Sequence, residues 1–339
     1  IGVATPATVG GFTLAPGHSY QFKLTDAGAL SIQDTTGRNL ATVPMPARIE
    51  PADGGATLLA GRRYRGALEI IAAPGAPGKL TVVNDVGLED YLKGVLPAEM
   101  VTGWPTHALQ AQAVAARTYA AANMGRRAAL GFDLYPTVSD QVYKGQDSEC
   151  VDTSAAVDST RGEAMTYQGS LINALFFSSS GGATDDAKAV WDIDLPYIKS
   201  VKDPDGSPNA AWKTNLSKDQ VTAGLTKLGV DVGTPTKITI TAHTPGGRAR
   251  WLSVTGTKGT ETVDAAKFRL AIGLKSTMFQ INRTRDGWQL DGSGYGHGLG
   301  MSQWGAHNRA AAGQAYQDIL KTYYTGIEIG GGTPPANAQ

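Results

Sequence analysis

The sequence has little cysteine, no surplus of charge of either sign and no long apolar run. Among its 339 residues Cys150 is the one cysteine, so neither a disulfide nor a multi-thiolate metal site can form within the chain. The five histidines are scattered without the close spacing of a zinc site, and we expect no metal. No segment approaches the roughly 20 consecutive apolar residues of a transmembrane helix, and we therefore expect no membrane span.

The balance of charge and the glycine content exclude further classes of function. Lys plus Arg and Asp plus Glu both number 30, and a chain without a net positive field is not expected to bind nucleic acid. Glycine-rich stretches lack the strand-to-helix context of a dinucleotide-binding motif, and we expect no cofactor. With 41% hydrophobic residues and 43 glycines, the chain has the composition of a folded protein that is rich in turns and strands.

Periodicity predicts a β-rich start followed by helices. Residues 1–61 read as short strands and turns, and Leu68–Ile71 with Leu80–Val83 reads as a hairpin. Helical spacing then covers Leu88–Leu96, where Pro97 interrupts it, and a long helix of small residues is predicted over 106–124. Further strands are predicted over 171–178, 237–242, 251–255 and 278–283, and further helices over 263–270, 306–312 and 316–323.

Glu99 lies in an apolar stretch, Val95–Val101, in the predicted connection between two helices. Apolar surroundings disfavour the charged form of a carboxyl group, raise its pKa and allow it to donate a proton near neutral pH, as cleavage of a glycosidic bond requires. A second interpretation is structural: Glu99 could cap the helix that begins near Thr106 or pair with a surface cation.

A glycine-dense segment, Gly294–Gly305, surrounds His297, Ser302 and Gln303. Glycine permits the close approach of a ligand, and the polar side chains could hydrogen-bond a sugar, although an ordinary loop with a satisfied histidine has the same composition. The serines of Ser178–Thr184 are interpreted as hydrogen-bonding loop residues rather than nucleophiles, because Gly-x-Ser-x-Gly is absent.

Taken together, these segments resemble the SpoIID/LytB family, named for stage II sporulation protein D and for an amidase enhancer. The resemblance covers about residues 62–328. It is carried by Leu88–Met100, Trp104-Pro105, Ala108–Ala120, Ser139–Gly145, Ser178–Gly182, Arg269 with Gly273–Thr277, and Gly296–Ala306.

This resemblance implies an extracytoplasmic, secreted or wall-associated lytic transglycosylase. Such an enzyme cleaves the β-1,4 bond between N-acetylmuramic acid and N-acetylglucosamine in peptidoglycan glycan strands, with or without their stem peptides, and leaves a 1,6-anhydro end. Glu99 corresponds to the catalytic glutamate of the family. The residues expected to bind or support the sugars in the groove are Gln112, Arg117, Ser179, Ser180, Gly181, His297, Ser302 and Gln303.

The predicted fold is a mixed α+β fold, mainly antiparallel sheet, with the 106–124 helix at its centre and Gly-rich loops framing a glycan groove. We expect a β-rich segment over 1–61 packed on the main domain, a catalytic domain over 62–328 and a disordered tail over 329–339. Two other functions stay open at this point. One is a non-catalytic glycan-binding module that stimulates a cell-wall amidase, and the other is a hydrolase that uses Asp90 or Asp140 as a second carboxylate.

Overall fold

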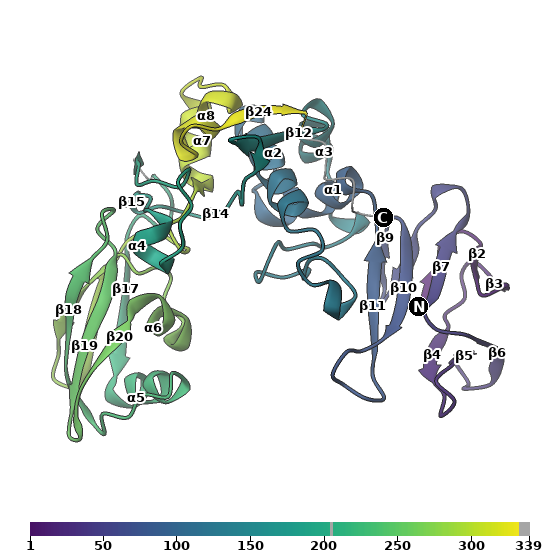
Figure 1. Cartoon of the computed structure of the whole chain (residues 1–339), viewed down its shortest axis with the longest axis horizontal. Helices are drawn as coiled ribbons and strands as arrows, with labels where there is room; N and C mark the ends of the chain where they lie inside the picture. Colours follow the sequence, from purple (N-terminus) through teal and green to yellow (C-terminus); the bar gives the residue numbers. More distant parts are fainter. Residues whose placement is uncertain (204–205, 332–339) are drawn as a thin grey trace. The chain divides into compact units, whose positions relative to one another are not determined.

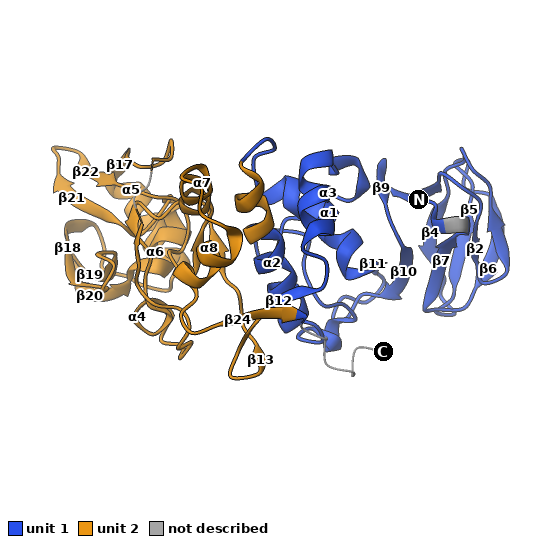
Figure 2. Ribbon diagram, turned by 90° about the horizontal axis from the view of Figure 1, so that it is seen from above, with its two compact units in different colours: residues 1–104, 112–164, 331–339 blue, residues 105–111, 165–330 orange. Residues whose placement is uncertain are grey.

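The computed structural model of the chain describes residues 1–203 and 206–331 and divides into two compact units (Figure 2). Unit 1 contains residues 1–104, 112–164 and 331, and unit 2 contains residues 105–111 and 165–330. Helices and small antiparallel sheets alternate along the chain, so the predicted mixed α+β class is confirmed. None of the helices within the described ranges is both long and apolar enough to cross a membrane.

Three small sheets occupy the first quarter of the chain in unit 1. Their orders are β1-β8-β9, β4-β5-β6 and β11-β10-β7-β2-β3. The strands are β1 Gly2–Val3, β2 Ala7–Val9, β3 Phe12–Leu14, β4 Gln21–Leu24, β5 Leu30–Gln33, β6 Asn39–Val43, β7 Ala47–Pro51, β8 Thr57–Leu59, β9 Arg62–Tyr64, β10 Ala67–Ala72 and β11 Leu80–Asp85, with the short helix η1 Ala52–Gly54. Because β7 pairs with β10, one sheet joins residues from both sides of position 61.

The helices that come next after β11 belong to unit 1, except that residues 106–111 of α2 belong to unit 2. They are α1 Leu88–Glu99, α2 Thr106–Ala122, η2 Ala128–Leu130, η3 Gln146–Ser148 and α3 Val151–Ser159. The prediction that helix α1 stops before Pro97 is wrong, because the helix continues through Pro97 to Glu99. Proline removes one N–H donor from the last turn there without ending the helix. In α2 every residue from 111 to 120 is buried, which explains its run of alanines.

Unit 2 begins with short pieces and continues into a β-rich part. After residues 106–111 of α2 come β12 Glu163–Tyr167, whose first two residues belong to unit 1, β13 Ser170–Leu171, β14 Phe176–Phe177, β15 Gly182–Ala183, α4 Ala187–Trp191 and β16 Lys202–Asp203. The β-rich part contains β17 Trp212–Ser217, α5 Lys218–Lys227, β18 Pro235–His243, β19 Ala249–Gly256, β20 Gly259–Asp264, α6 Ala265–Ile272, β21 Phe279–Arg283 and β22 Gly287–Gly292. The chain returns through β23 Met301–Ser302, α7 Gln303–Ala311, α8 Tyr316–Tyr323 and β24 Glu328–Gly331.

Two three-stranded antiparallel sheets, β17-β22-β21 and β18-β19-β20, form the β-rich part of unit 2. Helices α5 and α6 lie beside them in Figure 1, and residues of both sheets and both helices share one hydrophobic core. Phe268 of α6 and Trp288 of β22 are almost completely buried in that core. Helix α5 begins with a full capping box, in which Ser217 and Gln220 exchange hydrogen bonds between side chain and backbone.

Several sequence predictions are confirmed at the level of elements. The hairpin of β10 and β11, the pairing of β18 with β19 and the helix α8 lie where they were expected. The strand predicted over 171–178 is wrong in extent, since only β13 and β14 are extended and paired there. The prediction of a disordered tail over 329–339 is wrong for Ile329, Gly330 and Gly331, which belong to β24, and residues 332–339 lie outside the described residues.

Candidate functional site

Glu99 is the last residue of α1, and its carboxylate is held by the segment that follows the long helix. The backbone N–H of Val142 donates to Oε1 of Glu99 over 2.7 Å. Glu99 is half-buried, between the buried Leu96 and Met100. The end of a helix disfavours negative charge, whereas the N–H donor stabilises it, so the position presents an oriented carboxyl group under two opposed electrostatic influences.

Tyr91 and Gln141 fix the segment that holds Glu99. The hydroxyl of Tyr91 donates to Oε1 of Gln141 at 3.1 Å, and Nε2 of Gln141 donates to the carbonyl of Ala116 at 3.2 Å. Burial, together with the charges of Asp140 and Glu99, raises the pKa of Tyr91 well above its usual range. Tyr91 therefore stays protonated and remains a donor, and the chain of bonds ties α1 to α2 beside Val142.

The two carboxylates considered as partners of Glu99 lie in different surroundings. Asp140 has no exposed side-chain surface, pairs with Arg127 at 2.8 Å and accepts hydrogen bonds from the hydroxyl of Tyr119 and the backbone N–H of Tyr135. Asp90 is nine positions before Glu99 in α1, which corresponds to about 13 Å along a helix axis. Asp140 is engaged in a buried ion pair, and Asp90 lies near the other end of the helix.

Gln112 and Arg117, both on α2, differ sharply in their partners. Arg117 is buried and makes a two-pronged ion pair with Glu89, at 2.9 and 2.8 Å, and its guanidinium also donates to the carbonyls of Val157 and Glu163. It joins α1, α2 and α3, which is a supporting role. Gln112 is completely buried, and neither its Oε1 nor its Nε2 has a hydrogen-bond partner among the described residues.

Backbone pairing brings the serine-rich and glycine-rich segments of unit 2 together. Strand β14 pairs in parallel with β23, and Ser179 and Tyr295 exchange two backbone hydrogen bonds of 3.0 and 2.8 Å. A Cβ at Gly296 would lie 2.7 Å from the side chain of Phe177, and one at Gly300 would lie 2.0 Å from the carbonyl oxygen of Leu175. The glycines of this motif are therefore needed for contact between the two segments.

The hydroxyls predicted to bind sugar are buried and bonded within the protein. Ser179 Oγ lies 2.7 Å from Ser207 Oγ, and Ser180 Oγ donates to the carbonyl of Asp203 at 3.1 Å. Gly181, with a φ of +73°, provides the turn after them. Ser302 is the N-cap of α7 and accepts from the N–H of Gly305 at 3.1 Å. This finding agrees with the interpretation of the serines as loop hydrogen-bonders.

His297 uses both ring nitrogens to hold backbone. Nδ1 accepts from the N–H of Leu299 at 3.1 Å, which leaves Nε2 protonated to donate to the carbonyl of Phe176 at 3.0 Å. Burial, followed by the charges of Arg269 and Arg248, lowers the pKa of His297 to about 3. The imidazole is therefore neutral, and the rings of Phe177 and Trp191 lie against it, with centroids 5.3 and 5.2 Å away.

Trp191 lies against His297 and was not singled out from the sequence. The two ring centroids are 5.2 Å apart, and Trp191 at the end of α4 is 37% exposed. Gln303, also in this unit, is nearly buried, and its Nε2 has no partner in the part of the chain that the structure describes. Nothing in the sequence distinguishes Trp191 from a core tryptophan, since it follows an ordinary apolar run.

A buried ion pair that sequence reasoning missed fixes the serine-rich segment. Nη2 of Arg248 donates to the carbonyls of Ser180 and Ala183 at 2.6 and 2.9 Å, and its Nε lies 3.7 Å from the carboxylate of Asp185. Burial raises the pKa of Asp185, which also accepts from Thr244 and from the N–H of Gly246. Arg248 thus holds the backbone of Ser180 and Ala183 and the carboxylate of Asp185 together.

The predicted site residues fall into two sets. Glu99, Gln112 and Arg117 belong to unit 1, and Ser179, Ser180, Gly181, His297, Ser302 and Gln303 belong to unit 2. That both sets line one groove stays a prediction. Within the described ranges no group of three or more His, Cys, Asp or Glu side chains is arranged to hold a metal ion.

Comparisons with known proteins agree with this arrangement of motifs. Residues 76–167 match the model of the stage II sporulation protein family (SpoIID), and residues 200–300 match a domain of unknown function (DUF8618). The chain is 34% identical over 269 residues to stage II sporulation protein D of Bacillus subtilis, an alignment that covers 73% of this chain and 75% of that protein.

Two further relatives extend the comparison. An uncharacterized protein of Brachyspira hyodysenteriae is 35% identical over 255 residues, which covers 74% of this chain and 68% of that protein. The amidase enhancer of Bacillus subtilis is 31% identical over 372 aligned positions, which covers 94% of this chain and 51% of that protein. With its blocks in order and relatives aligned over most of its length, this chain belongs to the stage II sporulation protein D family.

Proposed function

We propose that this protein is a lytic transglycosylase that cleaves the glycan strands of bacterial peptidoglycan outside the cytoplasmic membrane. The observation that carries the proposal is the single oriented carboxyl group of Glu99, held by Val142 at the end of α1. The substrate bond is the β-1,4 linkage between N-acetylmuramic acid and N-acetylglucosamine. The reaction forms a 1,6-anhydro ring on the muramic acid of the product.

Glu99 alone can supply both proton transfers of this reaction. Protonated Glu99 donates its proton to the glycosidic oxygen as the bond to C1 breaks, and N-acetylglucosamine leaves with a free hydroxyl. The 6-hydroxyl oxygen of the muramic acid then attacks C1 and gives its proton to the carboxylate of Glu99. The glutamate returns to its starting form, and no water is consumed.

The surroundings of Asp90 and Asp140 favour this mechanism over hydrolysis. Paired carboxylates of glycosidases stand roughly 5 to 9.5 Å apart, whereas Asp90 lies about 13 Å from Glu99 along α1. Asp140 is nearer in the fold but is buried against Arg127, where it cannot activate a water molecule. A mechanism with one carboxylate fits these positions better.

Trp191 can contact a sugar directly, whereas Gln112 is completely buried and needs its surroundings to open before it can do so. The exposed ring of Trp191 offers an apolar face to a pyranose, and the buried amide of Gln112 has hydrogen-bonding atoms that no described residue satisfies. Gln112 and Ala116 share one face of α2 by their spacing, and the carbonyl of Ala116 receives the bond from Gln141. Gln112 therefore faces the same part of unit 1 as the support of Glu99.

A second candidate function is a glycan-binding module that stimulates an amidase without cutting glycan itself. The observation in its favour is the alignment over 94% of the chain with a protein named amidase enhancer. Both functions require binding to the wall, but only the first requires a proton from Glu99.

Digestion of purified glycan strands separates these possibilities. Wild type, Glu99→Gln and Asp90→Asn are incubated with strands that carry or lack stem peptides, in water enriched in ¹⁸O, and the products are weighed by mass spectrometry. We expect anhydro ends without ¹⁸O from wild type and Asp90→Asn, and none from Glu99→Gln, whose amide oxygen can still accept from Val142.

Other outcomes contradict the proposal in defined ways. Reducing ends that carry ¹⁸O and vanish in Asp90→Asn would identify a hydrolase. If wild type and Glu99→Gln bind strands equally and release nothing, but both accelerate a wall amidase, the non-catalytic function is correct.

A further inference from the structure

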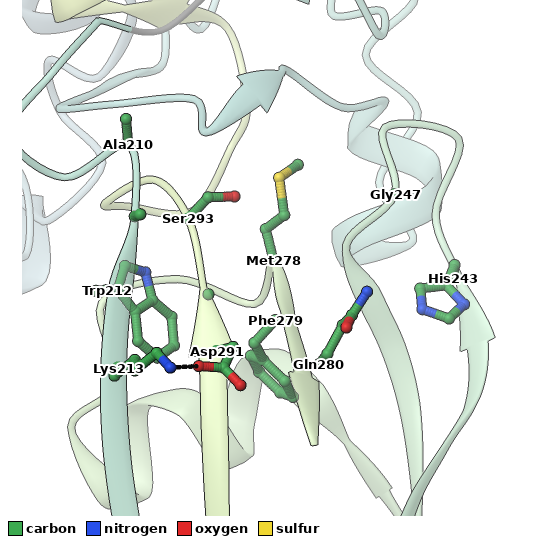
Figure 3. A pocket seen from close by; sticks show the side chains of 12 residues that line it. Ala210, Trp212, Lys213, His243, Gly247, Met278, Phe279, Gln280, Asp291 and Ser293 are labelled. Atoms are coloured by element: carbon green, nitrogen blue, oxygen red, sulfur yellow. Dashed lines mark ion pairs between the residues drawn. The ribbon is translucent and has the colours of Figure 1, made fainter. Parts of the chain in front are cut away.

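A groove of about 710 Å³ opens on unit 2, built entirely from the β-rich part (Figure 3). Its residues come from the neighbouring ends of β17, β21 and β22 and from the turn after β18. Pockets that hold small ligands measure roughly 300 to 1,000 Å³, so this groove has a suitable size. No predicted site residue lies in it.

The apolar part of the groove rests on one row of the sheet. Trp212, Gly292 and Phe279 are paired directly across β17, β22 and β21. A Cβ at Gly292 would lie 2.2 Å from the indole of Trp212, so a glycine is required for the ring to lie across β22, with its centroid 6.5 Å from that of Phe279. The indole Nε1 donates to the carbonyl of Gly294 at 3.1 Å, which fixes the ring.

The polar part of the groove is the next row, Lys213, Asp291 and Gln280. Nζ of Lys213 lies 3.2 Å from the carboxylate of Asp291, and Figure 3 shows this pair at one end of the groove. Asp291 also accepts from the amides of Asn282, at 2.9 Å, and Gln289, at 3.1 Å. Lys213 is 75% exposed and Gln280 is exposed, so both reach solvent.

The charges of this row select the class of ligand. The one ammonium group in the groove is paired with the one carboxylate, so the groove offers no surplus charge to a phosphate, a polyanion or a cationic peptide. It offers amide and ammonium donors and amide acceptors. Its apolar contact comes from Met278, which is partly exposed, because the core residues Trp212 and Phe279 reach it with only 7% and 5% of their surfaces exposed. A neutral ligand with hydroxyl and acetamido groups matches that mixture, because its hydroxyls need planar polar partners and its methyl groups need apolar contact.

We infer that this groove is a second glycan site, which binds N-acetylated sugars of the wall strand and does not cut them. Asp291 already accepts from three side chains, which suits it to orienting the row rather than to proton transfer. The inference rests on the proposed function for the identity of the polymer, but not on any activity of Glu99. A strand held at this groove would stay attached to the protein between cleavage events.

Binding of tetra-N-acetylchitotetraose to the full chain tests the inference. In the Glu99→Gln background, the double variant Lys213→Met/Asp291→Leu removes the pair without leaving an unpaired charge. The matched control is Lys258→Met/Asp231→Leu, which removes another exposed lysine–aspartate pair of unit 2, 2.6 Å apart. We expect the groove variant to weaken calorimetric binding at least tenfold and the control to leave it unchanged.

A second measurement protects the test against misfolding of the double variant. The indole N–H of Trp212 is followed by NMR in the otherwise unchanged Glu99→Gln protein as the tetrasaccharide or a sugar-free stem peptide is added, with Gln280→Ala as the mild variant. Shifts with the sugar that weaken in Gln280→Ala support the inference. Shifts with the stem peptide alone assign the groove to peptide, and no shift with either overturns it.

These outcomes are separable from failure of the proposed function. If the protein releases no anhydro ends but shows sugar-dependent shifts at Trp212, the proposed transglycosylase activity is wrong and the glycan site at the groove is supported. A chain that cleaves strands, yet shows no shift at Trp212, loses only the groove.

Discussion

The polar motif residues around Glu99 in unit 1 and in the paired loops of unit 2 differ in whether their polar atoms remain accessible. At Glu99 the fold supplies a donor to the motif residue and leaves it half-exposed. In the loops, the polar side-chain atoms of Ser179, Ser180 and His297 form hydrogen bonds within the protein. A residue can thus belong to a family motif because it touches substrate or because it builds the surface that does.

Arg248→Met should give the largest effect on the loops of unit 2. The variant leaves the buried carboxylate of Asp185 without its cation, and losing one partner of a buried pair typically costs about 3 to 5 kcal/mol. Urea unfolding at pH 7 measures the loss. Lys188→Met, which removes the exposed partner of Asp192, is the control and should leave the stability nearly unchanged, because solvent screens an exposed pair.

The same variant has a characteristic pH dependence. Burial already raises the pKa of Asp185, and loss of Arg248 raises it further, so protonation at lower pH should relieve part of the penalty. A penalty that is equally large at pH 5 and pH 7 would show that the lost backbone contacts matter, and not the charge.

His297 should make the stability of the protein depend on pH between about 3 and 6.5. The folded-state pKa is about 3 and the unfolded value is near 6.5, so the unfolded chain binds the extra proton within this interval. The free energy of unfolding therefore rises with pH through the interval, by at most about 1.4 kcal/mol per pH unit, and this contribution is complete above pH 6.5.

Denaturant unfolding from pH 4 to pH 7 measures that slope. His297→Asn should have a shallower slope than wild type, whereas His243→Asn, at an exposed histidine of the same unit, should keep it. Equal slopes in wild type and His297→Asn would mean that the imidazole is charged in the folded protein.

Gln112→Leu should separate stability from function at unit 1. The buried amide has no partner among the described residues, and a buried unsatisfied group costs about 1 to 3 kcal/mol, so leucine should stabilise the fold by about 1 kcal/mol. If the amide binds sugar, anhydro-product formation should fall at least tenfold in the same variant. Gln141→Leu is the matched control, since it breaks two existing hydrogen bonds and should destabilise the protein.

Ser302→Ala should give the smallest effect. Loss of an N-cap side chain costs typically about 1 kcal/mol, and Ser217→Ala, at the N-cap of α5, should cost a similar amount. Neither change should alter KM for glycan strands. A rise in KM for Ser302→Ala alone would return this serine to the substrate-contacting set and weaken the contrast between the two regions.

Local pattern predicted most elements of the fold but few of their contacts. Alternation and turn residues indicated β10 with β11, and the helical spacing indicated α1, α2 and α8. Helices α3 and α5 were missed, since their short sequences mix apolar and polar residues without a clear stripe. The extent of β14 depends on pairing with β23, 125 positions later for Phe176 and Met301, and no local pattern contains that information.

By itself, the sequence determined the class of fold and the family and singled out Glu99 as the candidate catalytic residue, because periodicity, glycine spacing and an apolar neighbourhood are properties of short segments. Tertiary structure alone decided which polar atoms form hydrogen bonds within the protein and which stay available to a ligand. The roles of His297 and Arg248 depend on carbonyl groups more than 60 positions away in the chain. The groove at Trp212 exists because three strands align their ends, and such alignment is a property of the folded sheet.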